Sequence, residues 1–246
     1  LKACSGNDMA IDELATISVL GFSDPVSSWT HLLGAVLALI IGIRLITRFR
    51  GSNLHRSGLV VFVFATVFLL SMSGVYHLLS HGSSGRYVLQ HLDHAAIWVM
   101  IAGTFTPIHL MLFKGWKRWG ILAFIWVAAI TGLVLKTVFF DGFPEWLGLI
   151  LYLGMGWAGL FSGILLAREY GIGFIRLLAY GGISYSVGAI MEFLRAPTIF
   201  PGIIGAHELF HFAIIIAIVC HWRFIEVVVL EVSQPMGEST KSYESE

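Results

Sequence analysis

Residues 57–79 read SGLVVFVFATVFLLSMSGVYHLL, and this stretch decides the fold. It holds no Asp, Glu, Lys or Arg, and it is long enough to cross the hydrocarbon core of a bilayer, which takes about 20 mostly apolar residues in an α-helix. Its last third carries Ser73 and His77, whose spacing places them on one face of a helix. The stretch therefore predicts a membrane helix with a polar site at one end.

Six further stretches have the same apolar character, and short connections rich in Gly, Pro or charge separate them. Backbone polar groups in lipid must be satisfied within a helix or a closed barrel, and these stretches are too long for barrel strands. The sequence therefore predicts an all-α integral membrane protein, a seven-transmembrane helix bundle. The expected spans are Trp29–Thr47, Ser57–Leu79, His91–Phe113, Trp119–Phe139, Trp146–Arg168, Arg176–Phe193 and His207–Leu230.

These spans also set the expected domain organisation. Residues 1–28 are a short polar N-terminal segment, residues 29–232 are the seven-helix transmembrane domain, and residues 233–246 are a polar tail that we expect to be disordered. None of the connections between spans is long enough to form a second domain.

The composition agrees with a lipid environment. Of the 246 residues, 57% are hydrophobic and 12% are charged, and the charged share is about half of the roughly 25% that is usual in soluble domains. The 15 basic and 15 acidic residues cancel, so the chain lacks the positive charge of a nucleic-acid binder and the high charge of a disordered protein. We therefore expect a lipid bilayer, and no nucleic acid, as its partner.

The polar residues of the predicted spans gather on one side of the membrane. Odd-numbered spans start, and even-numbered spans end, on the side of the N-terminus. Ionisable groups are costly at membrane depth, so their gathering on that side predicts one functional site. The residues placed there are His31, Ser73, His77, Asp93, His94, Glu192, Arg195, His207 and His211.

The string HELFH at residues 207–211 predicts a metal site. His207 and His211 are one helical turn apart, so both imidazoles can bind one ion, and His77 brings a third imidazole from the same side. Three His ligands with a fourth position open to water are typical of a catalytic zinc site. Because Asp93 can accept the proton of that water, the set predicts metal-assisted hydrolysis.

HELFH also fits the pattern H-E-x-x-H, in which Glu208 would be the general base of an intramembrane metalloprotease with His77 as third ligand. Against this alternative, Glu208 is rotated about 100° around the helix from His207, and Asp93 already offers a carboxylate.

Plainer roles are predicted for the remaining polar residues of this side. We expect His31 and His94 behind the metal ligands or at the membrane interface. Glu192 and Arg195 are three residues apart, a spacing that predicts an ion pair within one helix.

Three strings resemble the hemolysin III family, bacterial relatives of the progestin and adiponectin receptor family and of the alkaline ceramidase superfamily. They are SGVYH (73–77), LDHAAIWVMIAGTFTP (92–107) and HELFH (207–211), and the resemblance begins at SDPVSSWTHLLGA, residue Ser23. It implies a multi-pass protein of the bacterial cell (inner) membrane that holds Zn²⁺. Carried over to this sequence, it implies His77, His207 and His211 as the zinc ligands, with Ser73 and Asp93 as catalytic groups beside them.

By that resemblance the chain would be a zinc-dependent hydrolase of a membrane lipid amide or ester, similar to a ceramidase. The zinc ion would lower the pKa of its bound water toward about 7 and polarise the carbonyl. Asp93 would orient the water and take its proton, and Ser73 would hydrogen-bond the water or the developing oxyanion. A non-catalytic zinc-containing sensor or receptor, and a hemolysin, are the alternatives.

The basic residues are unevenly divided between the two sides of the membrane. The positive-inside rule therefore predicts that the N-terminus and the metal site face outward, whereas the resemblance to adiponectin receptors implies a cytosolic site. The side opposite the site carries Arg44, Arg48, Arg50, Arg56, Lys114, Lys117, Arg118, Arg168 and Arg176; the site side carries Lys2, Arg86, Lys136 and Arg195.

Overall fold

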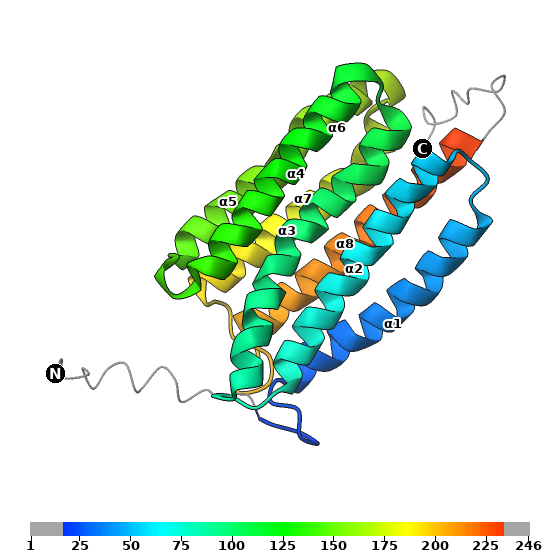
Figure 1. Cartoon of the computed structure of the whole chain (residues 1–246). Helices are drawn as coiled ribbons and strands as arrows, with labels where there is room; N and C mark the ends of the chain where they lie inside the picture. The colour runs from blue at the N-terminus through cyan, green and yellow to red at the C-terminus, as the bar shows by residue number, and fades with distance from the viewer. Residues whose placement is uncertain (1–16, 234–246) are drawn as a thin grey trace.

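The structure, a computed structural model, describes residues 17–233, and within them the chain forms a bundle of long helices (Figure 1). Seven helices are long and apolar enough to cross a membrane, with the fifth assembled from α5 and α6. The all-α seven-transmembrane prediction is therefore confirmed. The elements are α1 (Pro25–Arg48), α2 (Asn53–Leu78), α3 (Ser84–Leu112), α4 (Gly115–Val138), a 3₁₀ turn η1 (Phe140–Gly142), α5 (Glu145–Trp157), α6 (Gly159–Tyr170), α7 (Ile172–Leu194) and α8 (Ala206–Ser233).

Most helices extend beyond the apolar stretches that predicted them, because polar residues outside the hydrocarbon core continue the helix. The largest extension is in α3, which begins at Ser84 and not at His91, with Ser83 as its N-cap. The first helix begins at Pro25, so it takes in the last residues of the segment 1–28 that we expected to precede the bundle. The tail 233–246 lies outside the described residues beyond Ser233.

The fifth span was predicted to be one helix, and the structure divides it at Ala158 between α5 and α6. Three glycines, Gly154, Gly156 and Gly159, surround this point, and glycine weakens helices because it loses the most conformational freedom on folding. Ala158 keeps right-handed helical dihedral angles, and its amide N–H donates to the carbonyl of Gly154. The interruption therefore leaves the direction of the span intact.

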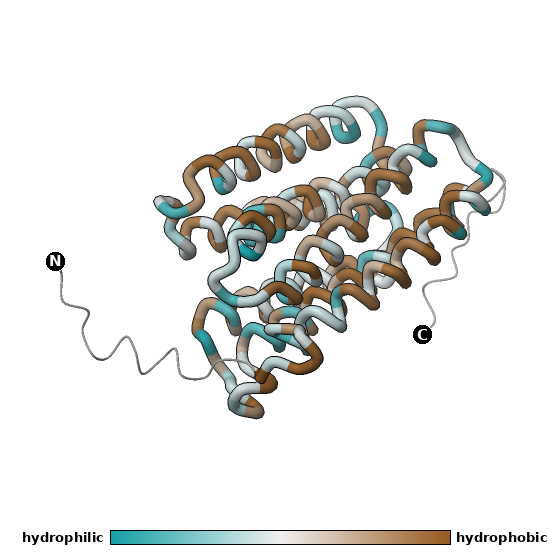
Figure 2. The backbone as a smooth tube through the Cα atoms, turned by 60° about the horizontal axis from the view of Figure 1, so that its bottom comes forward, coloured by the Kyte–Doolittle hydropathy of each residue, from teal (hydrophilic) through white to brown (hydrophobic). Residues whose placement is uncertain are grey.

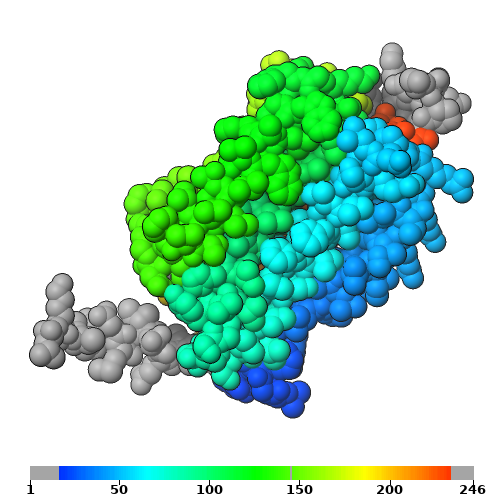
Figure 3. All heavy atoms as spheres, viewed as in Figure 1, coloured from blue at the N-terminus to red at the C-terminus, as the bar shows by residue number. Residues whose placement is uncertain are grey.

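The helix α3 is the most buried of the seven spans and belongs to both hydrophobic clusters of the core. One cluster joins it to α1, α2, α6, α7 and α8, and the other joins it to α4 and α5. The blue helix α1 lies at one edge of the bundle against α2 (Figures 1 and 3). Apolar residues run along the helices and hydrophilic ones concentrate toward their ends (Figure 2), as a bilayer requires.

Candidate metal centre

Three imidazole rings from two helices meet at one end of the bundle. His77 lies in the last turn of α2, and His207 and His211 lie in the first two turns of α8. The Nε2 atom of His207 is 3.2 Å from Nε2 of His77 and 3.0 Å from Nε2 of His211. The structure thus brings together the three His residues that the sequence predicted as ligands, with ligand atoms within 4.8 Å of one another.

The other ring nitrogen of each His contacts a partner from a different part of the chain. Nδ1 of His77 donates to Oδ2 of Asp24 at 2.9 Å, and Nδ1 of His207 donates to Oε1 of Glu192 at 3.1 Å. Nδ1 of His211 lies 3.1 Å from Nε2 of His31. These contacts fix the orientation of the rings and aim their Nε2 atoms at one point.

The pattern of donors explains why a cation fits there. A neutral imidazole that donates through Nδ1 has only a lone pair on Nε2, so His77 and His207 face each other with two lone pairs 3.2 Å apart. Such an approach is unfavourable unless a positive charge lies between the atoms. Zinc held tetrahedrally at about 2.0–2.1 Å from each nitrogen would separate the ligand atoms by about 3.3 Å, close to the 3.2 Å and 3.0 Å that separate Nε2 of His207 from Nε2 of His77 and of His211.

Asp24 is the residue of this centre that the sequence analysis missed. It is the N-cap of α1, and its backbone amide donates to the carbonyl of His77 at 3.0 Å, which joins the start of α1 to the end of α2. Its side chain also accepts from Nη2 of Arg86 at 2.6 Å, and both side chains are buried. The dipeptide Asp24–Pro25, typical of a helix start, was the available signal for its position but not for its partner.

Glu192 contacts a histidine on the next helix, a partner that its spacing with Arg195 did not predict. α7 ends at Leu194, and Arg195 takes a left-handed conformation with φ of 51°, from which it still interacts electrostatically with Glu192. The carboxylate of Glu192 lies 3.1 Å from Nδ1 of His207. The pair is the accessible side of the centre, since the side chains of His207 and Glu192 are 40% and 41% exposed.

Asp93, Ser73 and Glu208 occupy different positions around the three rings. Asp93, in α3, interacts electrostatically with His31, His77 and His207. Ser73 is buried one turn before His77 on α2.

Glu208 points elsewhere: its Oε2 accepts from the amide of Gly205 at 2.9 Å, and its Oε1 is 3.4 Å from the hydroxyl of Ser27. This carboxylate caps the N-terminus of α8.

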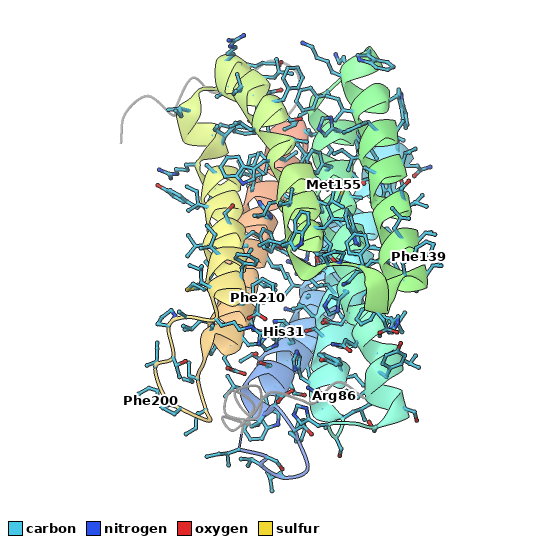
Figure 4. All side chains as sticks on the ribbon, turned by 90° about the vertical axis from the view of Figure 1, so that its left-hand side faces the viewer. His31, Arg86, Phe139, Met155, Phe200 and Phe210 are labelled. Carbon is cyan, nitrogen blue, oxygen red and sulfur yellow. The ribbon has the colours of Figure 1, made fainter. Side chains whose placement is uncertain are left out.

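The remaining histidines near this end lie outside the cluster. His31 is fully buried beside His211 in the interior (Figure 4), which is the position behind a ligand that we expected. His94 donates through Nδ1 to the carbonyl of Gln90, one turn earlier in α3.

A comparison with protein families places the chain among known proteins. Residues 22–222 match the family model described as haemolysin-III related. The chain belongs to this family. The matched range runs from the turn before Asp24 to beyond His211, so it holds every residue of the centre.

Curated members of the haemolysin-III related family align over most of their length. Hemolysin-3 of Bacillus cereus is 37% identical over 168 residues, which cover 65% of this chain and 74% of that protein. The hemolysin-3 homolog of Bacillus subtilis is 34% identical over 164 residues, 65% of this chain and 76% of that protein.

A plant protein is more distant, the heptahelical transmembrane protein 1 of Arabidopsis thaliana, at 24% identity over 85% of this chain and 70% of its own length. The seven apolar helices and the Bacillus relatives identify this haemolysin-III related chain as a multi-pass bacterial membrane protein.

Proposed function

We propose that this protein is a zinc-dependent membrane hydrolase that cleaves a lipid amide or ester, as a ceramidase does. The observation that carries the proposal is the convergence of three Nε2 atoms whose rings are fixed from behind by Asp24, Glu192 and His31. Three neutral imidazoles are a donor set typical of catalytic zinc. A polar site at one end of membrane-spanning helices also suits a substrate that stays in the bilayer.

The side chains divide the chemistry among themselves. His77, His207 and His211 would hold the ion, which when bound acidifies water and polarises a carbonyl. Asp93 would accept the proton of the attacking water and deliver it to the departing amine or alkoxide. The other product would be a fatty acid. The hydroxyl of Ser73 would donate a hydrogen bond to the oxygen that becomes negative in the transition state.

The placement of Glu208 favours this proposal over the metalloprotease. A general base must reach the water beside the ion, but both carboxylate oxygens of Glu208 are directed at the helix N-terminus and at Ser27. Replacing it with Gln keeps an oxygen for the cap, so Glu208→Gln is a control for the catalytic variants.

The test combines metal analysis with lipid turnover in nanodiscs. Protein purified without chelator should contain about one zinc per chain and release fatty acid from a panel of ceramides and phospholipids. Asp93→Asn should keep the zinc and lose activity by about 10²–10⁴-fold, the range for a positioned acid–base group. His207→Ala should lose both zinc and activity, while Glu208→Gln should retain both.

Three results would contradict the hydrolase. Absence of any transition metal would remove its basis. Zinc without turnover of any lipid in the panel would identify a sensor or structural protein. Activity that survives Asp93→Asn but fails in Glu208→Gln would identify the protease.

A further inference from the structure

The connection between α7 and α8 is an apolar hairpin beside the metal centre. Residues 196–205, APTIFPGIIG, contain no charged side chain. An isolated antiparallel bridge joins Phe200 to Ile204, and the amide of Ile204 donates to the carbonyl of Phe200 at 2.8 Å. The hairpin follows Glu192 and precedes His207, so it directly adjoins the open side of the centre.

Its large side chains project away from the protein. Ile199, Phe200 and Ile203 are 52%, 57% and 49% exposed, and Figure 4 shows Phe200 at the tip of the connection, far from the interior residue His31. Exposing three such side chains to water is costly. Soluble surfaces rarely cluster apolar residues in this way unless the cluster binds something.

The exposed surface continues onto elements of the same chemistry. On α7, Phe193 and Leu194 are exposed at the end of a helix that crosses the membrane. On the other side, the amide of Ile17 donates to the carbonyl of Gly202 at 2.9 Å, and both Ile17 and Leu20 are exposed. The hairpin is thus the margin of the lipid-facing surface and not an isolated patch.

The connections at the opposite end of the bundle differ in chemistry. They carry or adjoin Arg50, Lys114 and Arg168, as expected for segments that lie in water beyond the lipid headgroups. The hairpin, which carries no charge between residues 196 and 205, therefore differs in chemistry from the connections at the other end of the bundle.

We propose that the 196–205 hairpin inserts Ile199, Phe200 and Ile203 into the headgroup interface of the leaflet on the side of the metal centre, so that the bilayer is the partner of this surface. The insertion is that of an interfacial anchor, whose apolar side lies at the boundary of headgroups and acyl chains. Because the hairpin joins Glu192 to His207, it holds the open side of the centre at the level of the lipid headgroups. The proposal does not require that the centre hydrolyses anything.

Site-directed fluorescence in nanodiscs tests the insertion. In a background with Cys4→Ser and Cys220→Ser, an environment-sensitive label is attached at Phe200→Cys or, as the matched control, at Ser80→Cys in the α2–α3 connection of the same end. The Phe200 label should be quenched by lipids that carry a nitroxide near the headgroup. Aqueous iodide should quench the Phe200 label several-fold less than it quenches the Ser80 label. Ser80 is exposed and polar, so its label should show the opposite preference.

A second pair of variants tests whether the apolar character of Phe200 holds the hairpin in the membrane. Phe200→Asp should expel the hairpin and make a label at Ile203→Cys several-fold more accessible to iodide, whereas Phe200→Leu should leave that label unchanged. Equal iodide quenching at Phe200 and Ser80 would overturn the proposal, because the hairpin would then lie in water. Protection of Phe200 from both quenchers would also overturn it, since another protein surface would then cover the hairpin.

Discussion

Asp24 is the residue whose role is tested most directly. It accepts a hydrogen bond from Nδ1 of His77 and is itself paired with Arg86, an arrangement that would fix the tautomer of His77 as a zinc ligand and raise its basicity. We expect Asp24→Asn to weaken zinc affinity by about 10–100-fold, the usual effect of losing such a partner. Competition against a chromophoric chelator measures it, well below the unfolding temperature of each variant.

The matched control is Asp141→Asn. Asp141 is an exposed carboxylate at the same end of the bundle, where it accepts from the hydroxyl of Tyr87 at 3.0 Å. This variant should keep the wild-type zinc affinity. If both variants bound zinc equally well, the role of Asp24 would be structural only: it would cap α1 and pair with Arg86.

For single residues, the sequence predicts the three converging His rings better than it predicts the side chains behind them. The spacing of one helical turn predicts that His207 and His211 lie together. The count of spans predicts that His77, at the end of the second span, lies on the same side of the membrane. Both arguments use only the order of residues along the chain. Asp24 contacts His77 across 53 residues, and no local pattern encodes that contact. The contact between Glu192 and His207 joins two helices across 15 residues, and the spacing of Glu192 within its own helix does not indicate it.

Among the helices, α2 and α3 approach each other closely at Gly103. A methyl group on Gly103 of α3 would lie 2.4 Å from Cβ of Ala65 on α2, and neither atom belongs to a side chain that can rotate away. Small residues at such seams let helices approach closely in membranes. We therefore expect Gly103→Ala to destabilise the bundle by about 1–3 kcal/mol, as overpacking does.

Gly182→Ala on α7 is the control, because its added methyl group would meet nothing within 4 Å. It should be neutral or stabilising by about 0.5–1 kcal/mol, since alanine favours the helix. Reversible unfolding in mixed detergent micelles compares the two. Equal stabilities would mean that the α2–α3 seam relaxes without cost.

Helix ends show why element boundaries were harder to predict than elements. Hydropathy locates the part of a helix that lies in lipid, but α3 continues through Ser84–Gln90, where capping by Ser83 replaces apolar character as the signal. The division at Ala158 depends on a local balance of glycine and packing, including the approach of Phe105 to Gly159. Such a balance is not visible in a hydropathy pattern.

For the whole molecule, the structure strengthens the charge asymmetry that sequence counting found. On the side of the metal centre, Arg86 is buried and paired with Asp24, and Lys136 is buried against the rings of Phe140 and Phe143. Such buried side chains offer little positive charge to the membrane surface. The opposite end keeps its basic residues on helix ends and connections, as Arg48 in the last turn of α1 illustrates.

The positive-inside rule therefore predicts an outward-facing metal centre. Single cysteines report it, again with Cys4 and Cys220 replaced by Ser. An impermeant maleimide should label Ser80→Cys in intact cells or spheroplasts, and should label Asn53→Cys, at the exposed start of α2, only after permeabilisation. The reverse pattern would place the centre in the cytosol, as the resemblance to adiponectin receptors implies. With the predicted pattern, the centre would take its zinc from outside the cell, and the 196–205 hairpin would meet the outer leaflet.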